Sequence, residues 1–206
     1  DSYAAAFLRS DAVARRLLDG RAGRLVHVRT RQDGTLLELI GRSPATRAEE
    51  QGTHFTRLTV SRDAGGALQS REESAELQSQ VRLASGTIRS SLFAASDEAR
   101  IPDAIAVQIA EIFAADIDMH RELRRGDTFS VVYETLTADG EPVPWNEGAG
   151  RVLAAEFVNA GRAHHAVWYQ ADSGRGAYFG LDGQSKRRSF LSSPMEFSRV
   201  TSGFAM

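Results

Sequence analysis

The chain has 206 residues, with 25 Lys and Arg against 27 Asp and Glu, no Cys, and 42% apolar residues. Its length suits one large domain or two small ones, and its composition is that of a globular protein rather than a disordered one. A formal net charge of −2 argues against affinity for nucleic acid through phosphate neutralisation. The lack of cysteine excludes disulfides, thiolate zinc sites, iron–sulfur clusters and cysteine nucleophiles.

Residues 1–80 are expected to form a small N-terminal α/β regulatory domain. Helical spacing of apolar residues predicts a helix over residues 1–19. Runs with a period of two, separated by the RQDG and DAGG turns, predict four strands, at 24–30, 35–40, 54–61 and 67–71. The polar stretch 42–52, which contains Pro44, is predicted to be an exposed loop.

Residues 81–195 are expected to form a second α+β domain. The pattern predicts a strand from Val81, a short helix over 88–99 and an amphipathic helix from Pro102 to about Leu123. Further strands are predicted at 128–135, 151–159, 163–170 and 176–179. The fold class is therefore α+β, with helices packed on a short antiparallel sheet in each of two small domains.

The five histidines do not suggest a metal site. His164 and His165 are adjacent in a predicted strand, so their side chains point to opposite faces and cannot both reach one metal. No carboxylate lies at a spacing that would complete a zinc triad around either. His120 is interpreted as a charge partner for a helix C-terminus, and His27 and His54 as ordinary strand residues.

The carboxylates and the aromatic residues do not indicate a catalytic site either. Asp116 and Asp118 lie two apart on a predicted helix and do not face each other, while Glu72, Glu73 and Glu76 are interpreted as a solvated cluster near a strand end. Neither GxxxxGK[ST] nor GxGxxG occurs. Aromatic residues that could stack on a glycan, but that in strands more often belong to a core, are Tyr133, Trp145, Trp168, Tyr169 and Tyr178. The residues themselves therefore supply no catalytic, cofactor-binding or metal-ligating candidate.

The second half carries an ordered series of motifs. They are ARIPDAIAVQIAEIFAADIDMHRELRRGD at 99–127, FSVVYETL at 129–136, GRVLAAEFVNAGRAHHAVWY at 150–169, and YFGLDGQSKRRSFLSSPMEFSRVTSGFAM at 178–206. This series resembles the non-catalytic region that precedes the peptidase domain in LytM/lysostaphin-type zinc metallopeptidases of Gram-negative bacteria. Over residues 1–80 the resemblance is one of position only, since family members often carry another small α/β domain there.

The resemblance implies that zinc belongs to a domain outside this sequence. In the family, an SGF strand is followed by the first zinc-binding histidine, and an aspartate and an HxH pair complete the site. This sequence stops at Met206, before those positions. Residues 196–206 are thus expected to be a linker and the first strand of an absent catalytic domain. No catalytic residue of the family can be placed on this chain, which is expected to hold no cofactor and to be non-catalytic although its parent is an enzyme.

The family context implies a function in the bacterial cell wall. The expected function is that of a regulatory or substrate-positioning region in a zinc-dependent peptidoglycan endopeptidase, limiting access to the catalytic groove. The expected partners are its own catalytic domain, peptidoglycan and an activator protein, with no nucleic acid. The expected location is the periplasm or cell envelope, reached by a signal or anchor segment not present here. A guarding residue could lie on a loop such as 42–52, but the sequence singles out none.

A free-standing envelope adaptor or glycan-binding module is the alternative. The feature that separates the two hypotheses is the C-terminal SGFAM, an apolar strand without a polar stop, which would leave an unpaired edge in a finished domain. This feature favours the endopeptidase hypothesis. An enzyme with an unfamiliar site is disfavoured because no convergent polar cluster is recognisable.

Overall fold

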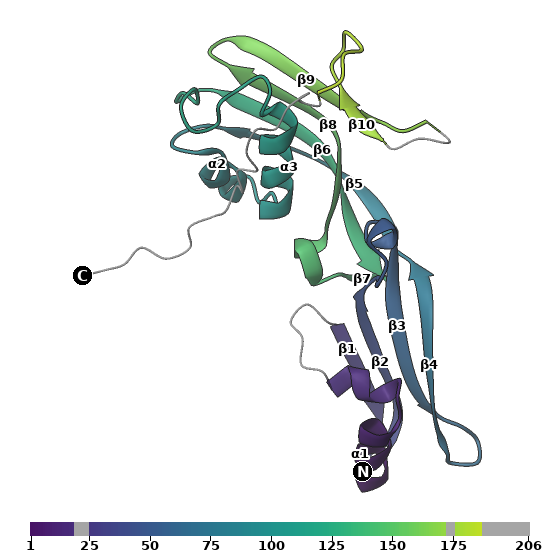
Figure 1. Ribbon diagram of the computed structural model, residues 1–206. Helices are drawn as coiled ribbons and strands as arrows, with labels where there is room; N and C mark the ends of the chain where they lie inside the picture. The colour runs from purple at the N-terminus through teal and green to yellow at the C-terminus, as the bar shows by residue number, and fades with distance from the viewer. Residues whose placement is uncertain (19–24, 172–175, 187–206) are drawn as a thin grey trace. The chain divides into compact units, whose positions relative to one another are not determined.

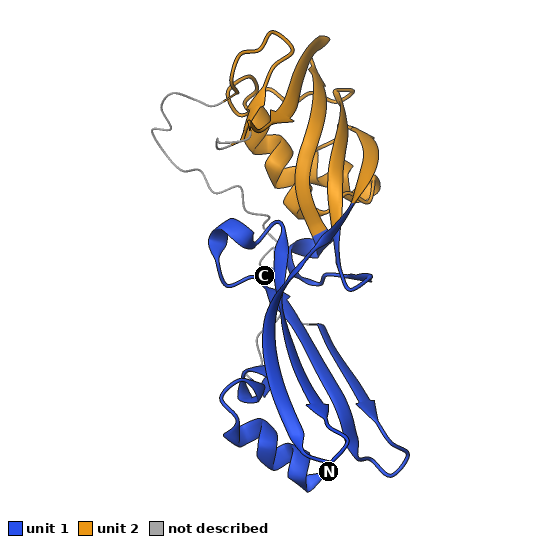
Figure 2. Ribbon diagram, turned by 90° about the vertical axis from the view of Figure 1, so that its right-hand side faces the viewer, with its two compact units in different colours: residues 1–79, 136–148 blue, residues 80–135, 149–206 orange. Residues whose placement is uncertain are grey.

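A computed structural model describes residues 1–18, 25–171 and 176–186 (Figure 1). Helices and strands are mixed, which confirms the expected mixed content, and the described residues contain three α-helices. The chain separates into two compact units, which are coloured in Figure 2. Unit 1 comprises residues 1–79 and 136–148, and unit 2 comprises 80–135 and 149–206. The domain boundaries expected from the sequence stay predictions, and the expected linker and strand at 196–206 lie outside the described residues.

Unit 1 contains a four-stranded antiparallel sheet in the order β1-β2-β3-β4 (Figure 1). Its elements up to β4 are α1 (Ser2–Ser10), the 3₁₀ helix η1 (Ala14–Leu18), β1 (Leu25–Thr30), β2 (Leu36–Pro44), the 3₁₀ helix η2 (Ala48–Glu50), β3 (His54–Arg62) and β4 (Leu68–Glu76). The four strands expected over residues 1–80 are therefore present. The single helix expected over 1–19 is wrong, because the side chain of Asp11 accepts hydrogen bonds from the N–H groups of Val13 and Ala14 and starts a separate 3₁₀ turn.

The two faces of this sheet carry different cores. On one face, Leu39 and Val60 pack with α1 and η1, and Gly41 leaves room for η1, because a Cβ there would lie 2.1 Å from the Leu17 side chain. On the other face, Phe55 packs under residues 136–148, which return to unit 1 as the end of β6, β7 (Glu141–Pro142) and the turn η3 (Trp145–Gly148).

The exposed loop expected at 42–52 begins later than predicted. Strand β2 continues to Pro44, and Arg42 is only 6% exposed. Arg42 is buried by the segment that contains Asp139, which lies 97 positions further along the chain. The Arg42 guanidinium donates a hydrogen bond to the Asp139 carboxylate. The polar composition of this stretch therefore predicted a loop start that is too early, because a polar residue of β2 is buried by an ion pair.

Unit 2 is built on a sheet with the strand order β10-β9-β8-β6-β5, and β7 pairs with β6 off this path (Figure 1). Its elements are β5 (Gln78–Thr87), α2 (Leu92–Glu98), α3 (Asp103–Phe113), β6 (Thr128–Ala138), β8 (Ala149–Asn159), β9 (Arg162–Tyr169) and β10 (Ala177–Phe179). Helices α2 and α3 lie on one face. There Phe157 stacks on Phe129 with ring centroids 6.0 Å apart and meets Phe113 edge-on at 5.9 Å, which forms the centre of the core.

Both helices of unit 2 are shorter than expected. Ser91 caps α2 by accepting the Ala94 N–H at 3.1 Å, so the predicted start at residue 88 is wrong. Helix α3 ends at Phe113 instead of near Leu123. Just beyond it, the Asp118 side chain accepts the N–H groups of His120 and Arg121, at 2.9 and 3.2 Å, and forms a separate turn.

The shorter α3 changes two interpretations made from the sequence. His120 does not end a helix, and Asp116 and Asp118 do not lie on one.

No helix in the part of the chain that the structure describes is long and apolar enough to cross a lipid bilayer.

Candidate functional site

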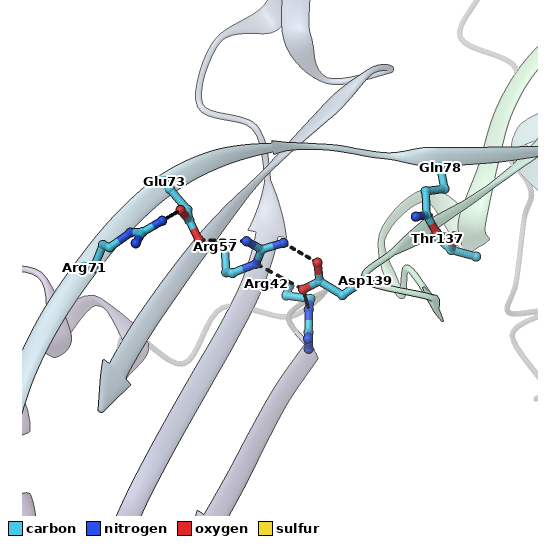
Figure 3. A network of polar contacts seen from close by, with 7 residues as sticks. All are labelled: Arg42, Arg57, Arg71, Glu73, Gln78, Thr137 and Asp139. Carbon is cyan, nitrogen blue, oxygen red and sulfur yellow. Dashed lines mark hydrogen bonds and ion pairs between the residues drawn. The ribbon is translucent and has the colours of Figure 1, made fainter. Parts of the chain in front are cut away.

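A network of charged side chains in unit 1 is centred on Asp139 (Figure 3). Asp139 and Gly140 form the two-residue turn between β6 and β7, with φ of 54° and 81°. Asp-Gly suits this turn because both positions need positive φ, which Gly adopts freely and Asp tolerates. The turn presents the Asp139 carboxylate to the face of the sheet that carries Phe55.

Antiparallel pairing places the partners of Asp139 in one row. Arg42 of β2, Arg57 of β3 and Glu73 of β4 are direct register neighbours. The Asp139 Oδ2 atom accepts from Arg42 Nε at 2.5 Å and from Arg57 Nε at 3.1 Å, and Arg57 Nη2 also donates to Oδ1. Arg57 Nη1 donates to Glu73 at 2.7 Å, and Arg71 donates to the other Glu73 oxygen.

The electrostatics of this network keep Asp139 ionised. Burial raises the pKa of Asp139, but hydrogen bonds and charge from Arg57 and Arg42 outweigh burial and hold the pKa below its usual range. Arg42 is the most buried member, and its Nη1 has no hydrogen-bond partner among the described residues. Both carboxylates are engaged by arginines, so the arrangement offers no nucleophile with a neighbouring base. The network is structural: its ion pairs hold residues 136–148 on the sheet.

The histidines of unit 2 each meet one carboxylate. His164 Nδ1 lies 3.8 Å from Asp116 Oδ1, and Lys186 Nζ lies 2.8 Å from Asp116 Oδ2. Burial lowers the pKa of His164, and the Asp116 carboxylate only partly offsets this effect. On the neighbouring position of β9, His165 Nε2 lies 2.8 Å from Glu156 Oε2. Sequence reasoning missed both carboxylates, since neither is close to its histidine along the chain.

These pairs do not fit a zinc site. A protein zinc site needs three or four converging ligands, and each pair supplies one histidine and one carboxylate. Within residues 1–18, 25–171 and 176–186, no group of three or more His, Cys, Asp or Glu side chains could hold a metal.

The glutamates expected to form a solvated cluster lie at the carboxyl end of β4, and Glu72 and Glu76 are exposed as expected. Glu72 pairs with Arg16, and Glu73 is partly buried and belongs to the network of Figure 3. The arginine partners of Glu72 and Glu73 could be recognised only from the folded chain. The prediction of a solvated cluster near a strand end therefore holds for Glu72 and Glu76 and is wrong for Glu73.

The aromatic residues divide between core and surface. Tyr133 is buried, and Tyr178 donates its hydroxyl to the Val152 carbonyl at 2.9 Å, with burial raising its pKa to about 12. Trp168 lies beneath the Arg151 guanidinium at 4.1 Å and meets Tyr178 edge-on. Tyr169, by contrast, is 62% exposed.

Solved structures share this fold. A zinc containing peptidase from Vibrio cholerae matches with a TM-score of 0.52 and 18% identity, covering 100% of this chain and 62% of that one. Csd3 from Helicobacter pylori, in its orthorhombic crystal, matches with a TM-score of 0.56 and 11% identity, covering 84% of this chain and 46% of that one. At these identities the similarity concerns the fold alone.

A curated protein is related in sequence. The chain is 30% identical over 129 residues to the peptidoglycan DD-endopeptidase ShyC of Vibrio cholerae serotype O1, an alignment that takes in 63% of this chain. The aligned part spans only 28% of that relative's length. No family model matches the chain. The chain is thus related in sequence to part of a peptidoglycan DD-endopeptidase.

Proposed function

We propose that this chain is a regulatory and substrate-positioning region of a zinc-dependent peptidoglycan endopeptidase, itself non-catalytic, that limits access to the catalytic groove of a separate peptidase domain. The observation that carries the proposal is the 129-residue relationship to a peptidoglycan DD-endopeptidase, 30% identical. The fold shared with a zinc containing peptidase supports it. The cell envelope is the corresponding location.

A physical argument explains why such a region would be needed. A catalytic zinc keeps one coordination position open for water or substrate, so an enzyme that cuts its own cell's wall must restrict access to that position. Interfaces between domains of one chain are commonly modest and partly polar, so a covering region can be displaced. Peptidoglycan or an activator protein would then release the groove.

The first test is the composition of the native protein. We expect the intact polypeptide in its source cells to contain one further domain, roughly 100–200 residues, and to carry one zinc by elemental analysis of the same sample. A native product of this chain's own mass, without zinc, would contradict the proposal.

The second test concerns regulation. The peptidase domain, produced separately, is expected to solubilise purified sacculi faster than the intact protein, and addition of the 206-residue chain should slow it. The same chain after heat unfolding is the control, and it should have no effect. Equal rates for the separate domain and the intact protein would rule out restricted access.

A glycan-binding module is a second candidate, favoured by one observation. Tyr169 is 62% exposed and meets the Phe179 ring edge-on at 6.3 Å, an arrangement on which a sugar face could stack. If this candidate is right, Tyr169→Ala weakens binding to glycan strands freed of peptide. Tyr3→Ala, at another exposed tyrosine in unit 1, should leave binding unchanged.

A further inference from the structure

The outer edge of the unit 2 sheet combines four features of a peptide-docking strand. Strand β5 ends the strand order, so one of its sides has no neighbouring strand among the described residues (Figure 1). The Ile88 N–H and C=O bond to Asp127 and Gly126 at 2.7 and 2.8 Å, which points the main-chain groups of Ile88 toward the β6 side. Because these groups alternate along an antiparallel strand, those of Ser85 and Thr87 point outward.

Exposed apolar side chains follow the same edge. Val81 and Leu83 are 63% and 76% exposed, and their spacing of two residues places both on one face of β5. Strands at a sheet edge are usually shielded by charge, proline or covering segments when they do not bind another strand, and between the two apolar residues β5 carries one such charge, the exposed Arg82. A strand added beside β5 would cover both side chains.

A groove of about 470 Å³ lies between this edge and α2. The groove is open because small residues line it. Gly86 has no side chain, and Ala95 and Ala99, one helical turn apart, contribute only methyl groups. A Cβ at Gly86 would lie 2.6 Å from the Phe129 ring, so the groove cannot be narrowed there without disturbing the core. Side chains of an added strand that face α2 must therefore be small.

Two opposite charges stand at one end of the groove. Arg89 Nη1 and Glu98 Oε2 are 3.8 Å apart, and their side chains are 71% and 57% exposed. An ion pair this exposed is weak and exchanges partners readily. An antiparallel strand beside β5 would begin next to Thr87, so its amino-terminal residue would lie near Arg89.

We propose that the β5 edge binds an extended antiparallel segment of a partner protein, with an acidic residue at its amino-terminal end, small residues facing α2 and apolar residues facing Val81 and Leu83. Main-chain hydrogen bonds to Ser85 and Thr87 provide the affinity, and the alternating side chains provide the specificity, as in other cases of strand addition. The charge of Arg89 selects the acidic residue. This docking does not depend on the peptidase proposal, because it requires neither a peptidase domain nor peptidoglycan.

The test uses the 206-residue chain and a fluorescein-labelled, end-capped octapeptide that has glutamate at its amino-terminal end and alternates serine and valine after it. Fluorescence anisotropy is expected to show saturable binding. A twin peptide, N-methylated at the amides that would face β5, should bind at least tenfold more weakly, because methylation removes the ladder hydrogen bonds and keeps the side chains. Equal binding by the twin would overturn the proposal, as would a lack of binding by the octapeptide.

Protein variants separate docking from nonspecific adhesion. Leu83→Asp should weaken binding at least fivefold, whereas Val28→Asp, at the exposed edge strand β1 of unit 1, should change it less than twofold. Arg89→Glu should weaken binding of the glutamate peptide and strengthen binding of a peptide with lysine in its place. Equal effects of the two aspartate variants, or no exchange of preference in Arg89→Glu, would contradict the proposal.

Two further measurements exclude other occupants of the edge. In hydrogen exchange by NMR, the Ser85 and Thr87 amides of the free chain should exchange much faster than that of Ile88 and become protected by the octapeptide. Protection in the free monomer would mean that the chain covers its own edge and would overturn the proposal. A mass that doubles with concentration in light scattering, and that the octapeptide reverses, would instead assign the edge to a second copy.

Discussion

Asp139 shows how one residue can hold a distant segment in place. It sits in a turn with φ of 54°, so an alanine there would add backbone strain to the loss of charge. Asp139→Asn tolerates the turn, removes the charge and replaces one accepting oxygen with an amide NH2 group, which cannot accept from an arginine. Because Arg42 is buried and would lose its charged partner, we expect the free energy of unfolding of unit 1 to fall by about 2 kcal/mol in urea titrations.

Glu141→Gln provides the matched control for this variant. Glu141 is exposed in the same hairpin, so the substitution should change the free energy of unfolding by less than about 0.5 kcal/mol. If Asp139→Asn were as mild as this control, the network of Figure 3 would contribute little to stability.

His164 predicts a loss of stability on mild acidification. Burial lowers its pKa from the ordinary value of 6.5 in spite of the nearby Asp116. Below pH 6.5 the unfolded chain therefore binds the proton more readily than the folded chain. The stability that the neutral ring contributes is present above pH 6.5 and is lost as the pH falls from there toward the folded pKa. Thermal unfolding midpoints at pH 7.5 and 5.5 should show the decline.

Substitution tests the assignment to His164. In His164→Gln the decline between pH 7.5 and 5.5 should be smaller, because the titrating ring is gone. His165→Gln, at the next position of β9, serves as the matched control and should keep the wild-type decline. Loss of the decline in the control alone would contradict the assignment.

Among the elements, α3 is joined to the sheet by hydrogen bonds from the Gln108 side chain as well as by the apolar core. Gln108 Nε2 donates to the Gly150 carbonyl and Gln108 Oε1 accepts the Val152 N–H, both at 2.9 Å, so it satisfies the main chain of β8. Gln108→Met keeps the length of the side chain but leaves both main-chain groups unpaired. We expect a loss of about 2 kcal/mol in the free energy of unfolding.

The measurement is chemical denaturation of unit 2, with Glu111→Met as the control. Glu111 is exposed on the same helix, so this methionine should have little effect. A similar loss in both variants would point to helix propensity rather than to the bonds with β8.

Strands could be predicted better than helix ends for a physical reason. Alternation of side chains across a half-buried sheet is a local pattern, and it predicted β1, β2, β3 and β4. Apolar spacing also predicted α3, but it continues past the true end, since Ile117 is buried four positions after Phe113. The spacing cannot reveal that the Asp118 carboxylate competes for main-chain N–H groups and makes a turn instead.

The polar sites could not be predicted in the same way. Arg42 and Asp139 are 97 positions apart, and Asp116 follows α3 whereas its partner His164 lies in β9. Their meeting depends on how sheets and turns pair, which local composition does not encode. The family resemblance of the second half identified the relationship to a peptidase because it rests on an ordered series of motifs rather than on contacts.

At the scale of the whole molecule, the apolar cores follow the two units. The cluster around Phe157 contains residues of unit 2 only, and those around Val60 and Phe55 contain residues of unit 1 only, within the described chain. Each unit also has one tryptophan, Trp145 in unit 1 and Trp168 in unit 2. Trp168→Phe and Trp145→Phe therefore yield chains whose fluorescence reports one unit each.

These probes test whether the two cores unfold as one. Phe157→Ala removes a fully buried ring from unit 2 and should cost about 3–5 kcal/mol there. We expect the denaturation midpoint reported by Trp168 to fall clearly, and that reported by Trp145 to move much less, because no residue of the Phe157 cluster belongs to unit 1. Val60→Ala, in the unit 1 core, is the reciprocal variant and should reverse the pattern. Equal shifts at both tryptophans in both variants would show that the two units unfold in a single cooperative transition. Strands β5 and β6 would then couple the two cores, because each strand has residues in both units.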